Sequence, residues 1–253
     1  MNNGCGILYL AFGEEFDKLT AASARYSRKF TDLPICVLTN LKETNQVWKS
    51  VQNVCFKFVD LPSEKNRRVK VSLLDYSPYD ETIFMDSDAV VQKVGIESLF
   101  DLLEDFDLVC QYYGRVYYDS SLNNWAVETQ GRKSHLTSNF CKKTYDKLAK
   151  ILGEKYPIEL FGEAAVIFKK SSFSEKFFAL WRKYWQIMGE GRDMPAFCFA
   201  VKHFGSKVKA LRDEEVKFCT NVENEGFFIQ HKGFRGFEDK FGLPRYKDWN
   251  PKL

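Results

Sequence analysis

The stretch "ETIFMDSDAVV", residues 81–91, decides the fold prediction. Three apolar residues at 83–85 lead directly into two aspartates, Asp86 and Asp88, and more apolar residues follow. A short apolar run of this kind is typical of a buried strand. If the extended conformation continues through residue 88, both carboxylates point to the same face of the sheet. Their Cα atoms then lie about 6.6 Å apart.

This pair of carboxylates predicts a bound cation. Two negative charges at that separation repel by about 2.5 kcal/mol at an effective dielectric constant near 20. A divalent metal held by oxygen ligands removes the repulsion. The pair also follows the end of a strand, where open α/β sheets bind their ligands. The alternative is that both aspartates are solvated in an exposed turn.

Strands and helices alternate in the first third of the chain. Apolar runs predict strands at 6–12, 34–40, 53–62 and 81–86, and the spacing of apolar residues predicts helices at 14–30 and 69–80. This alternation is typical of a parallel α/β sheet with helices on both faces. We therefore expect an α/β fold with a mostly parallel central sheet.

The remaining chain is less regular. We expect helices at 96–106, 142–152, 171–188 and 193–204, and strands at 107–113, 163–170 and 227–231. Asp193 is the expected N-cap of its helix, with Pro195 in the first turn. The polar and aromatic stretch 114–139 has no clear period, and we expect a long functional loop there.

Composition restricts the class of protein. The chain has 253 residues, so we expect one domain, with two small domains as the alternative. The net charge is only +3, so we expect no nucleic-acid partner. Seven cysteines, an odd number without a C-x-x-C pair, favour a reducing, cytoplasmic location. The N-terminus has no basic region typical of a signal peptide, and no apolar run reaches the ~20 residues of a membrane span, so we expect neither.

The order of these segments resembles GT-A-fold glycosyltransferases, which use nucleotide-sugar donors. "IFMDSDAVV" resembles their metal-binding D-x-D motif, and Lys70 stands sixteen residues before Asp86, where glycogenin-like (family 8-like) members carry a lysine. "FGEAAVIFKKS" at 161–171, "RDMPAFCFAV" at 192–201 and "IQHKG" at 229–233 are similar to later elements of the family. The resemblance spans roughly residues 6–235.

Two departures leave the subfamily and the stereochemistry of transfer open. Met194 stands where the family usually has a glutamine. After His231 the chain offers Lys232, Gly233 and Arg235 instead of the usual glycine and lysine spacing.

The resemblance implies a GT-A-type, Rossmann-like sheet in a single domain over 1–253. Residues 1–92 would form the nucleotide-binding half, and 93–253 the acceptor-side half with a C-terminal metal-ligand segment. The implied activity is metal-dependent transfer of a sugar from a nucleoside-diphosphate donor to a hydroxyl group of a glycan, protein or small molecule. A UDP-sugar is the expected donor, with a GDP-sugar as the alternative.

The resemblance also implies a set of site residues. The implied metal ligands for Mn²⁺, or else Mg²⁺, are Asp86, Asp88 and His231. The residues expected to bind the nucleotide and the donor are Leu10, Ala11, Phe12, Thr39, Asn40, Lys70, Ser87 and Lys232. Arg67, Arg68 and Arg235 are further candidates for a diphosphate contact.

Asp193 and Glu163 are the expected catalytic residues. Asp193 either caps its helix or accepts hydrogen bonds from donor hydroxyls, or does both. Glu163 interrupts the apolar entry to its strand, so it is either a general base or a ligand of the donor sugar. Tyr112, Tyr113, Tyr117, Tyr118 and Trp125 either stack against a sugar or pack a lid.

Two other functions compete with this hypothesis. A haloacid-dehalogenase-type phosphatase also uses a strand followed by D-x-D, but its later G-D-x-x-x-D pair is missing from the sequence. A non-catalytic carbohydrate-binding module would use the aromatic residues without needing Lys70 or the two aspartates.

Overall fold

The computed structural model describes residues 4–44, 46–121, 123–129, 132–135, 139–212, 215, 219–220 and 226–230. Its first half contains β1 (Cys5–Ala11), α1 (Glu14–Ser27), β2 (Ile35–Thr39), η1 (Gln46–Ser50), β3 (Val54–Phe58), η2 (Ser63–Lys65), α2 (Asn66–Lys70), α3 (Leu73–Tyr76), β4 (Glu81–Met85), β5 (Ala89–Val91) and η3 (Ile96–Leu103). Its second half contains β6 (Leu108–Asp119), β7 (Asn124–Thr129), β8 (Arg132–His135), α4 (Asn139–Leu152), β9 (Ile158–Lys169), α5 (Ser172–Ile187), α6 (Met194–His203), η4 (Gly205–Lys207), β10 (Val208–Leu211), β11 (Cys219–Thr220) and β12 (Phe228–Gln230).

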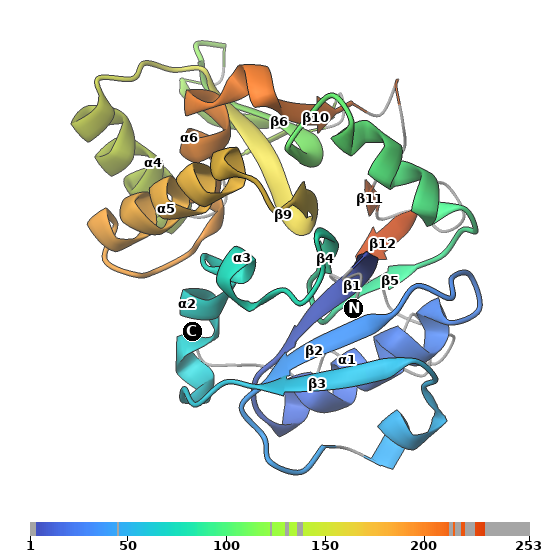
Figure 1. Ribbon diagram of the computed structural model, residues 1–253. Helices are drawn as coiled ribbons and strands as arrows, with labels where there is room; N and C mark the ends of the chain where they lie inside the picture. The colour runs from blue at the N-terminus through green and yellow to red at the C-terminus, as the bar shows by residue number, and fades with distance from the viewer. Residues whose placement is uncertain are drawn as a thin grey trace.

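The main sheet has the order β3-β2-β1-β4-β9-β6-β7-β8, and β10 also pairs with β6. β3, β2, β1 and β4 are mutually parallel, and β9 runs antiparallel to both β4 and β6. β6 and β10 therefore run in the direction of the first four strands (Figure 1). The expected α/β fold with a mostly parallel central sheet is confirmed.

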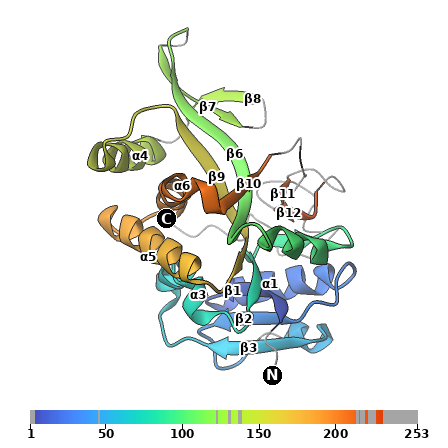
Figure 2. The ribbon, with the colours of Figure 1, turned by 45° about the horizontal axis from the view of Figure 1, so that its top comes forward.

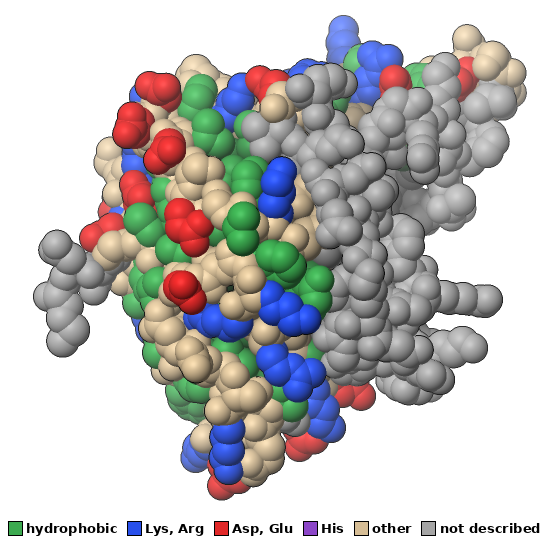
Figure 3. All heavy atoms as spheres, turned by 90° about the vertical axis from the view of Figure 1, so that its right-hand side faces the viewer, with side chains coloured by type: hydrophobic (Ala, Val, Ile, Leu, Met, Phe, Trp, Pro, Cys, Tyr) green, Lys and Arg blue, Asp and Glu red, His purple; other side chains and the backbone are tan. Residues whose placement is uncertain are grey.

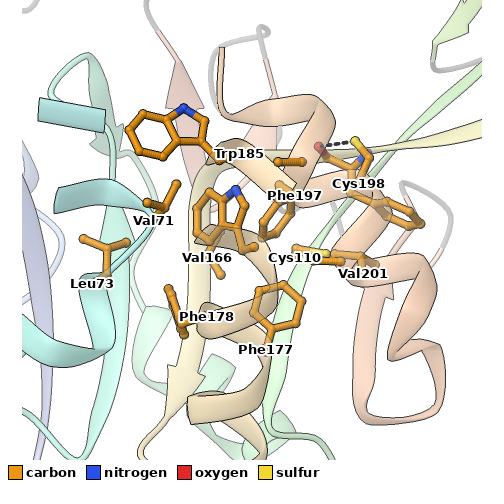
Figure 4. Close-up of a cluster of buried hydrophobic side chains, with 14 of the residues drawn as sticks. Val71, Leu73, Cys110, Val166, Phe177, Phe178, Trp185, Phe197, Cys198 and Val201 are labelled. Carbon is orange, nitrogen blue, oxygen red and sulfur yellow. Dashed lines mark hydrogen bonds between the residues drawn. The ribbon is translucent and has the colours of Figure 1, made fainter. Parts of the chain in front are cut away.

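Helices cover both faces of this sheet because side chains alternate along each strand. On one face, Leu8 and Phe84 join a core with the helices α5 and α6. On the other face, Ile7 and Ile83 pack with α1 and η3. Figure 4 shows the first core, in which Phe177 of α5 and other aromatic side chains meet side chains of α6 and β9.

Helix α5 is stabilised by a capping hydrogen bond at its start and by side-chain packing in its middle. The Ser171 side chain accepts a hydrogen bond from the Ser174 backbone nitrogen at 3.1 Å, which caps the helix at its start. Trp181, in the middle of the helix, is fully buried and packs edge-on against Phe197 of α6 at 4.9 Å between ring centroids. The expected helix at 171–188 is confirmed, and it fixes the position of the first turn of α6.

Four expectations about local structure were wrong. The stretch 69–80 is not one helix, because α2 ends at Lys70 and a separate turn of helix, α3, begins at Leu73. The stretch 114–139 is not a loop, since it completes β6 and contains β7, β8 and the start of α4. The third error is that β9 begins at Ile158 rather than after Gly162.

The fourth error concerns the opening stretch, where the strand ends at Met85 and does not continue through residue 88.

The length of β6 and β9 explains why a loop was wrongly expected at 114–139. β6 and β9 pair with each other beyond the central sheet, and β7 pairs with the distal part of β6 (Figure 2). Long-range pairing of this kind leaves no local period in the sequence.

The described surface carries both signs of charge. On the face shown in Figure 3, acidic and basic side chains are both present among apolar ones. Within the described part of the chain, every helix is too short or too polar to cross a bilayer.

Substitution of Gly6 by alanine should destabilise the fold. A Cβ atom at Gly6 would lie 2.4–2.6 Å from three ring atoms of Tyr79, whose side chain is buried. We expect the free energy of unfolding to fall by about 1–3 kcal/mol, as is usual for overpacked cores, and urea denaturation would measure the loss.

Gly4→Ala is the matched control, because nothing lies within 4 Å of a Cβ atom at that position. Equal urea midpoints for the two alanine variants would contradict the steric explanation.

Candidate functional site

The two aspartates of the opening stretch lie in a turn. The Ala89 backbone nitrogen donates a hydrogen bond to the Asp86 carbonyl at 2.9 Å, which closes a four-residue turn between β4 and β5. The expectation that Asp86 and Asp88 project from one strand face is therefore wrong. The turn, rather than the pleat of a strand, sets the positions of the two carboxylates.

Buried hydroxyl groups fasten this turn to its neighbours. The Ser87 side chain donates to the Leu10 carbonyl of β1 at 2.5 Å, and Ser23 of α1 donates to the Ser87 carbonyl at 2.7 Å. Ser27, also in α1, accepts a hydrogen bond from the Val91 backbone nitrogen at 2.9 Å. Ser87 was expected to bind the donor, but its side chain faces inward and its hydroxyl is used in this anchoring.

Lys70 lies at the centre of an acidic cluster. Its Nζ atom is 2.8 Å from Asp86 Oδ1, 3.3 Å from Asp193 Oδ2 and 3.8 Å from Glu163 Oε1. Arg67, one turn earlier in α2, places Nε 3.6 Å from Asp193 Oδ1. The cluster therefore joins α2, the turn after β4, β9 and the start of α6.

The members of this cluster differ in burial. The Lys70 and Asp193 side chains are only 8% and 9% exposed, whereas that of Arg67 is 38% exposed. Burial by itself lowers the pKa of the Lys70 ammonium group, but Asp193, Asp86 and Glu163 outweigh burial and raise the pKa above its usual range.

Lys70 is therefore a fixed cation at neutral pH. Because its pKa is higher in the folded state, its contribution to stability is complete at neutral pH. That contribution declines only as the pH rises above the unfolded-state value of about 10.4.

Lys70 and Arg67 contact three carboxylates, those of Asp86, Glu163 and Asp193. Asp193 Oδ2 is buried and accepts no hydrogen bond within the described structure, so its contact with Lys70 is purely ionic. Within the described residues, the cluster therefore contains a carboxylate oxygen that no hydrogen bond uses.

Asp193 occupies the N-cap position of α6, as expected, but its side chain does not cap the helix. The carboxylate turns toward Lys70 and Arg67 instead. Its backbone carbonyl accepts a hydrogen bond from Trp181 Nε1 of α5 at 3.2 Å. The residue is therefore held from behind by α5, and its carboxylate belongs to the acidic cluster.

Glu163 lies within β9 and not at its entry. The neighbouring residue, Ala164, accepts a hydrogen bond from the Asp86 backbone nitrogen at 2.8 Å, so β9 runs directly alongside the acidic turn. This pairing brings Glu163 into the cluster although it is 77 residues from Asp86 in the sequence.

The ends of β1 and β2 form a second part of the candidate site. Ala11 and Thr39 are cross-strand partners at the last position of each strand, so the two carboxyl ends meet. Asn40 Oδ1 accepts a hydrogen bond from the Gly13 backbone nitrogen at 2.8 Å, and Asn40 Nδ2 donates to Ser63 Oγ at 3.1 Å. Asn40 thus ties the loops after β1, β2 and β3 together.

Other residues expected to bind the donor are in the core. Leu10 and Phe12 are buried on the face covered by α5 and α6, and Ala11 is buried on the opposite face. Side chains of these residues pack the sheet, so a donor at this edge would meet their backbone rather than their side chains.

Part of the expected site lies outside the described residues, namely His231, Lys232 and Arg235. The Trp125 side chain is likewise not described. Among the described residues, no three His, Cys, Asp or Glu side chains are grouped closely enough to hold a metal ion by themselves.

Sequence reasoning missed four residues that shape the site. Ser23 and Trp181 contact the site from helices on opposite faces of the sheet, and Gly13 and Ser63 contact Asn40. Only Gly13 carried a usable signal, because a glycine directly after a buried strand often marks a special backbone conformation, and its φ is +85°.

The structure is similar to several solved glycosyltransferases. It matches the apo form of WbbM, a bifunctional glycosyltransferase, with a TM-score of 0.56 and 13% identity over 93% of this chain and 47% of that one. It matches mouse xyloside xylosyltransferase 1 with a TM-score of 0.56 and 11% identity over 91% and 98% of the two chains. It also matches the galactosyltransferase LgtC, solved with donor and acceptor sugar analogues, with a TM-score of 0.53 and 12% identity over 98% of each chain.

These matches establish the fold. The chain has a GT-A-type fold. It spans about half the length of WbbM but nearly the whole length of the other two. No family model and no curated protein matches the sequence.

Replacement of Lys70 by methionine should strongly destabilise the protein. The substitution removes the central cation and leaves three partly or fully buried carboxylates facing one another. We expect a loss of about 3–5 kcal/mol in the free energy of unfolding, measured by urea denaturation, as is usual when one partner of a buried ion pair is removed.

Lys202→Met is the matched control, since the Lys202–Glu154 ion pair is more exposed and should contribute at most about 1 kcal/mol. A loss for Lys70→Met no larger than that for Lys202→Met would show that the cluster does not depend on its lysine.

Proposed function

We propose that the protein is a metal-dependent glycosyltransferase that moves a sugar from a nucleoside-diphosphate donor, a UDP-sugar in the first instance, to an acceptor hydroxyl. One observation carries the proposal, namely the acidic cluster around Lys70 next to the carboxyl ends of β1, β2 and β4. Ligands of open α/β sheets bind at this edge. The similarity of the fold to solved glycosyltransferases supports the proposal.

The residues present fit a divalent cation. Carboxylate oxygens suit Mn²⁺ and Mg²⁺, and one turn after β4 supplies two carboxylates, those of Asp86 and Asp88. Asp86 and Asp88 would hold the ion, with His231 as the third ligand. When bound, such an ion stabilises the charge that develops on a departing diphosphate.

Three residues of the cluster would position the substrates. Lys70, as a fixed cation, would hold Asp86 and Asp193 in place and favour an anionic diphosphate nearby. Asp193, with a buried oxygen that accepts no hydrogen bond, would accept one from a hydroxyl of the donor sugar. Glu163 would orient the same sugar or take a proton from the acceptor, depending on which hydroxyl comes within hydrogen-bond distance.

The nucleoside would bind at the ends of β1 and β2. Asn40 already organises three loops there, and the extended segment at 10–12 offers backbone groups for a base or ribose. Lys232 would add a positive charge toward the diphosphate.

A screen of nucleotide sugars tests the proposal directly. Each sugar nucleotide would be incubated with the protein and with Mn²⁺, Mg²⁺ or a chelator, and both thermal stability and release of free nucleoside diphosphate would be measured. A true donor raises the melting temperature by mass action, and the rise should require metal.

The same screen distinguishes the two alternatives. A phosphatase that uses Asp86 as its nucleophile would release inorganic phosphate and form a phospho-aspartate. A carbohydrate-binding module would bind glycans with neither metal nor nucleotide. Either result would overturn the transferase proposal.

Asp86→Asn and Asp88→Asn should each lower metal-dependent release of nucleoside diphosphate by about 100-fold or more, because each removes an anionic ligand while keeping its shape. The half-saturating Mn²⁺ concentration should rise as well. Asp105→Asn, at an exposed position away from the cluster, is the control and should leave both values unchanged.

Circular dichroism of each variant would separate loss of the site from loss of the fold. Full turnover in both folded asparagine variants at the original Mn²⁺ requirement would refute the assignment of these aspartates.

A further inference from the structure

Two cysteines lie next to each other on adjacent strands, and neither belongs to the proposed site for sugar transfer. Cys36 of β2 and Cys55 of β3 are direct cross-strand partners in a parallel ladder. Such partners project from the same face of the sheet, with Cα atoms about 4.8 Å apart. That separation falls within the range of about 4.4–6.8 Å that a disulfide bond can bridge.

The two thiols differ in their access to solvent. Cys36 is 1% exposed, because β2 lies between β1 and β3. Cys55 is exposed, because β3 is the last strand at this end of the described sheet. A small oxidant can therefore reach Cys55 from solvent, and the buried partner lies directly behind it.

The surroundings of Cys55 stabilise a thiolate. The Cys36 thiol and the Tyr79 hydroxyl neighbour the Cys55 sulfur, and their interactions with the thiolate outweigh partial burial and lower the pKa of Cys55 to about 6. The neighbouring Cys55 sulfur raises the pKa of Cys36, as burial also does, whereas the charge of Lys57 on β3 acts in the opposite direction.

The other described cysteines have the opposite surroundings. Cys5 donates its proton to Glu81 Oε2 at 3.0 Å, and burial together with that carboxylate raises the pKa of Cys5 to about 12. Cys110 and Cys198 are buried, and burial raises the pKa of each thiol. Among the five cysteines whose side chains the structure describes, Cys55 alone is both exposed and stabilised as a thiolate.

We propose that Cys55 and Cys36 form a modification site for hydroperoxides, in which Cys55 is oxidised first and Cys36 then closes a cross-strand disulfide. The Cys55 thiolate attacks one peroxide oxygen, the O–O bond breaks, and the leaving hydroxide takes up a proton to become water. Cys36 then attacks the sulfur of the Cys55 sulfenic acid, the S–O bond breaks, and the departing hydroxide combines with the Cys36 proton as a second water. Two thiols lose two electrons, and one hydrogen peroxide gains them.

The disulfide would join the edge strand covalently to the strand that carries Thr39 and Asn40 at its end. The chemistry uses no residue of the acidic cluster, so its tests do not depend on whether the protein transfers sugars.

The first test is differential reactivity in the intact chain. Iodoacetamide would be applied to the native protein across a range of pH, and alkylation of each cysteine would be followed by peptide mass spectrometry. Cys55 should react about tenfold or more faster than Cys5 at pH 7, with a rate that levels off above about pH 6 to 7. Equal rates for Cys55 and Cys5, or an inflection near pH 8.5, would overturn the proposal.

The second test is oxidation with hydrogen peroxide at pH 7. A peptide containing a Cys36–Cys55 disulfide should form in the wild-type chain, and thioredoxin or dithiothreitol should reverse it. In Cys36→Ser, the disulfide should be absent and dimedone should trap a sulfenic acid at Cys55. Oxidised chains in which Cys36 is still a free thiol would refute its role in closing the disulfide.

Two further variants separate this mechanism from a general sensitivity to oxidant. Tyr79→Phe keeps the ring but removes the hydroxyl group that lowers the pKa of Cys55, so alkylation of Cys55 at pH 7 should slow by about threefold or more. Cys5→Ser should leave the rates at Cys55 unchanged. Unchanged reactivity in Tyr79→Phe together with slower reaction in Cys5→Ser would contradict the assigned environment.

Discussion

The candidate site depends on a single buried ammonium group. Lys70 contacts three carboxylates that come from the turn after β4, from β9 and from the start of α6. Each carboxylate would be costly in this setting without a counter-ion, because burial disfavours the charged form. The lysine therefore holds together three segments that are far apart in sequence, and its fixed charge excludes it from any role in proton transfer at neutral pH.

The acidic turn is supported from the other side of the sheet as well. Ser23 and Ser27 of α1 and the carbonyl of Leu10 form a buried set of hydrogen bonds around Ser87 and Val91. Helix α5 supports Asp193 through Trp181. The acidic turn and Asp193 are thus held by elements on both faces of the sheet.

The buried, strongly perturbed ionisable groups of this cluster are of the kind that tends to gather at functional sites. The thiol pair of β2 and β3 is separate from this cluster, and its expected reactivity is confined to the sulfur of Cys55 on the edge strand.

The division of the chain into a nucleotide-binding half and an acceptor-side half stays a prediction, as does the cytoplasmic location.

The sequence alone determined the α/β class and the capped helix at 171–188, because local apolar patterns and cap residues act over a few neighbours. It also placed Lys70, Asp193 and Glu163 among the candidates. It could not show that these residues meet, since their contacts span from 16 to 123 residues of sequence and depend on the pairing of β4 with β9.

Only the tertiary structure decided that the opening stretch ends its strand at Met85 and that Asp193 faces Lys70 instead of capping its helix. It also showed that 114–139 contributes strands to the sheet. For Asp193 and for 114–139, a long-range ion pair or strand pairing outweighed the local preference, and no pattern of neighbouring residues records such contacts.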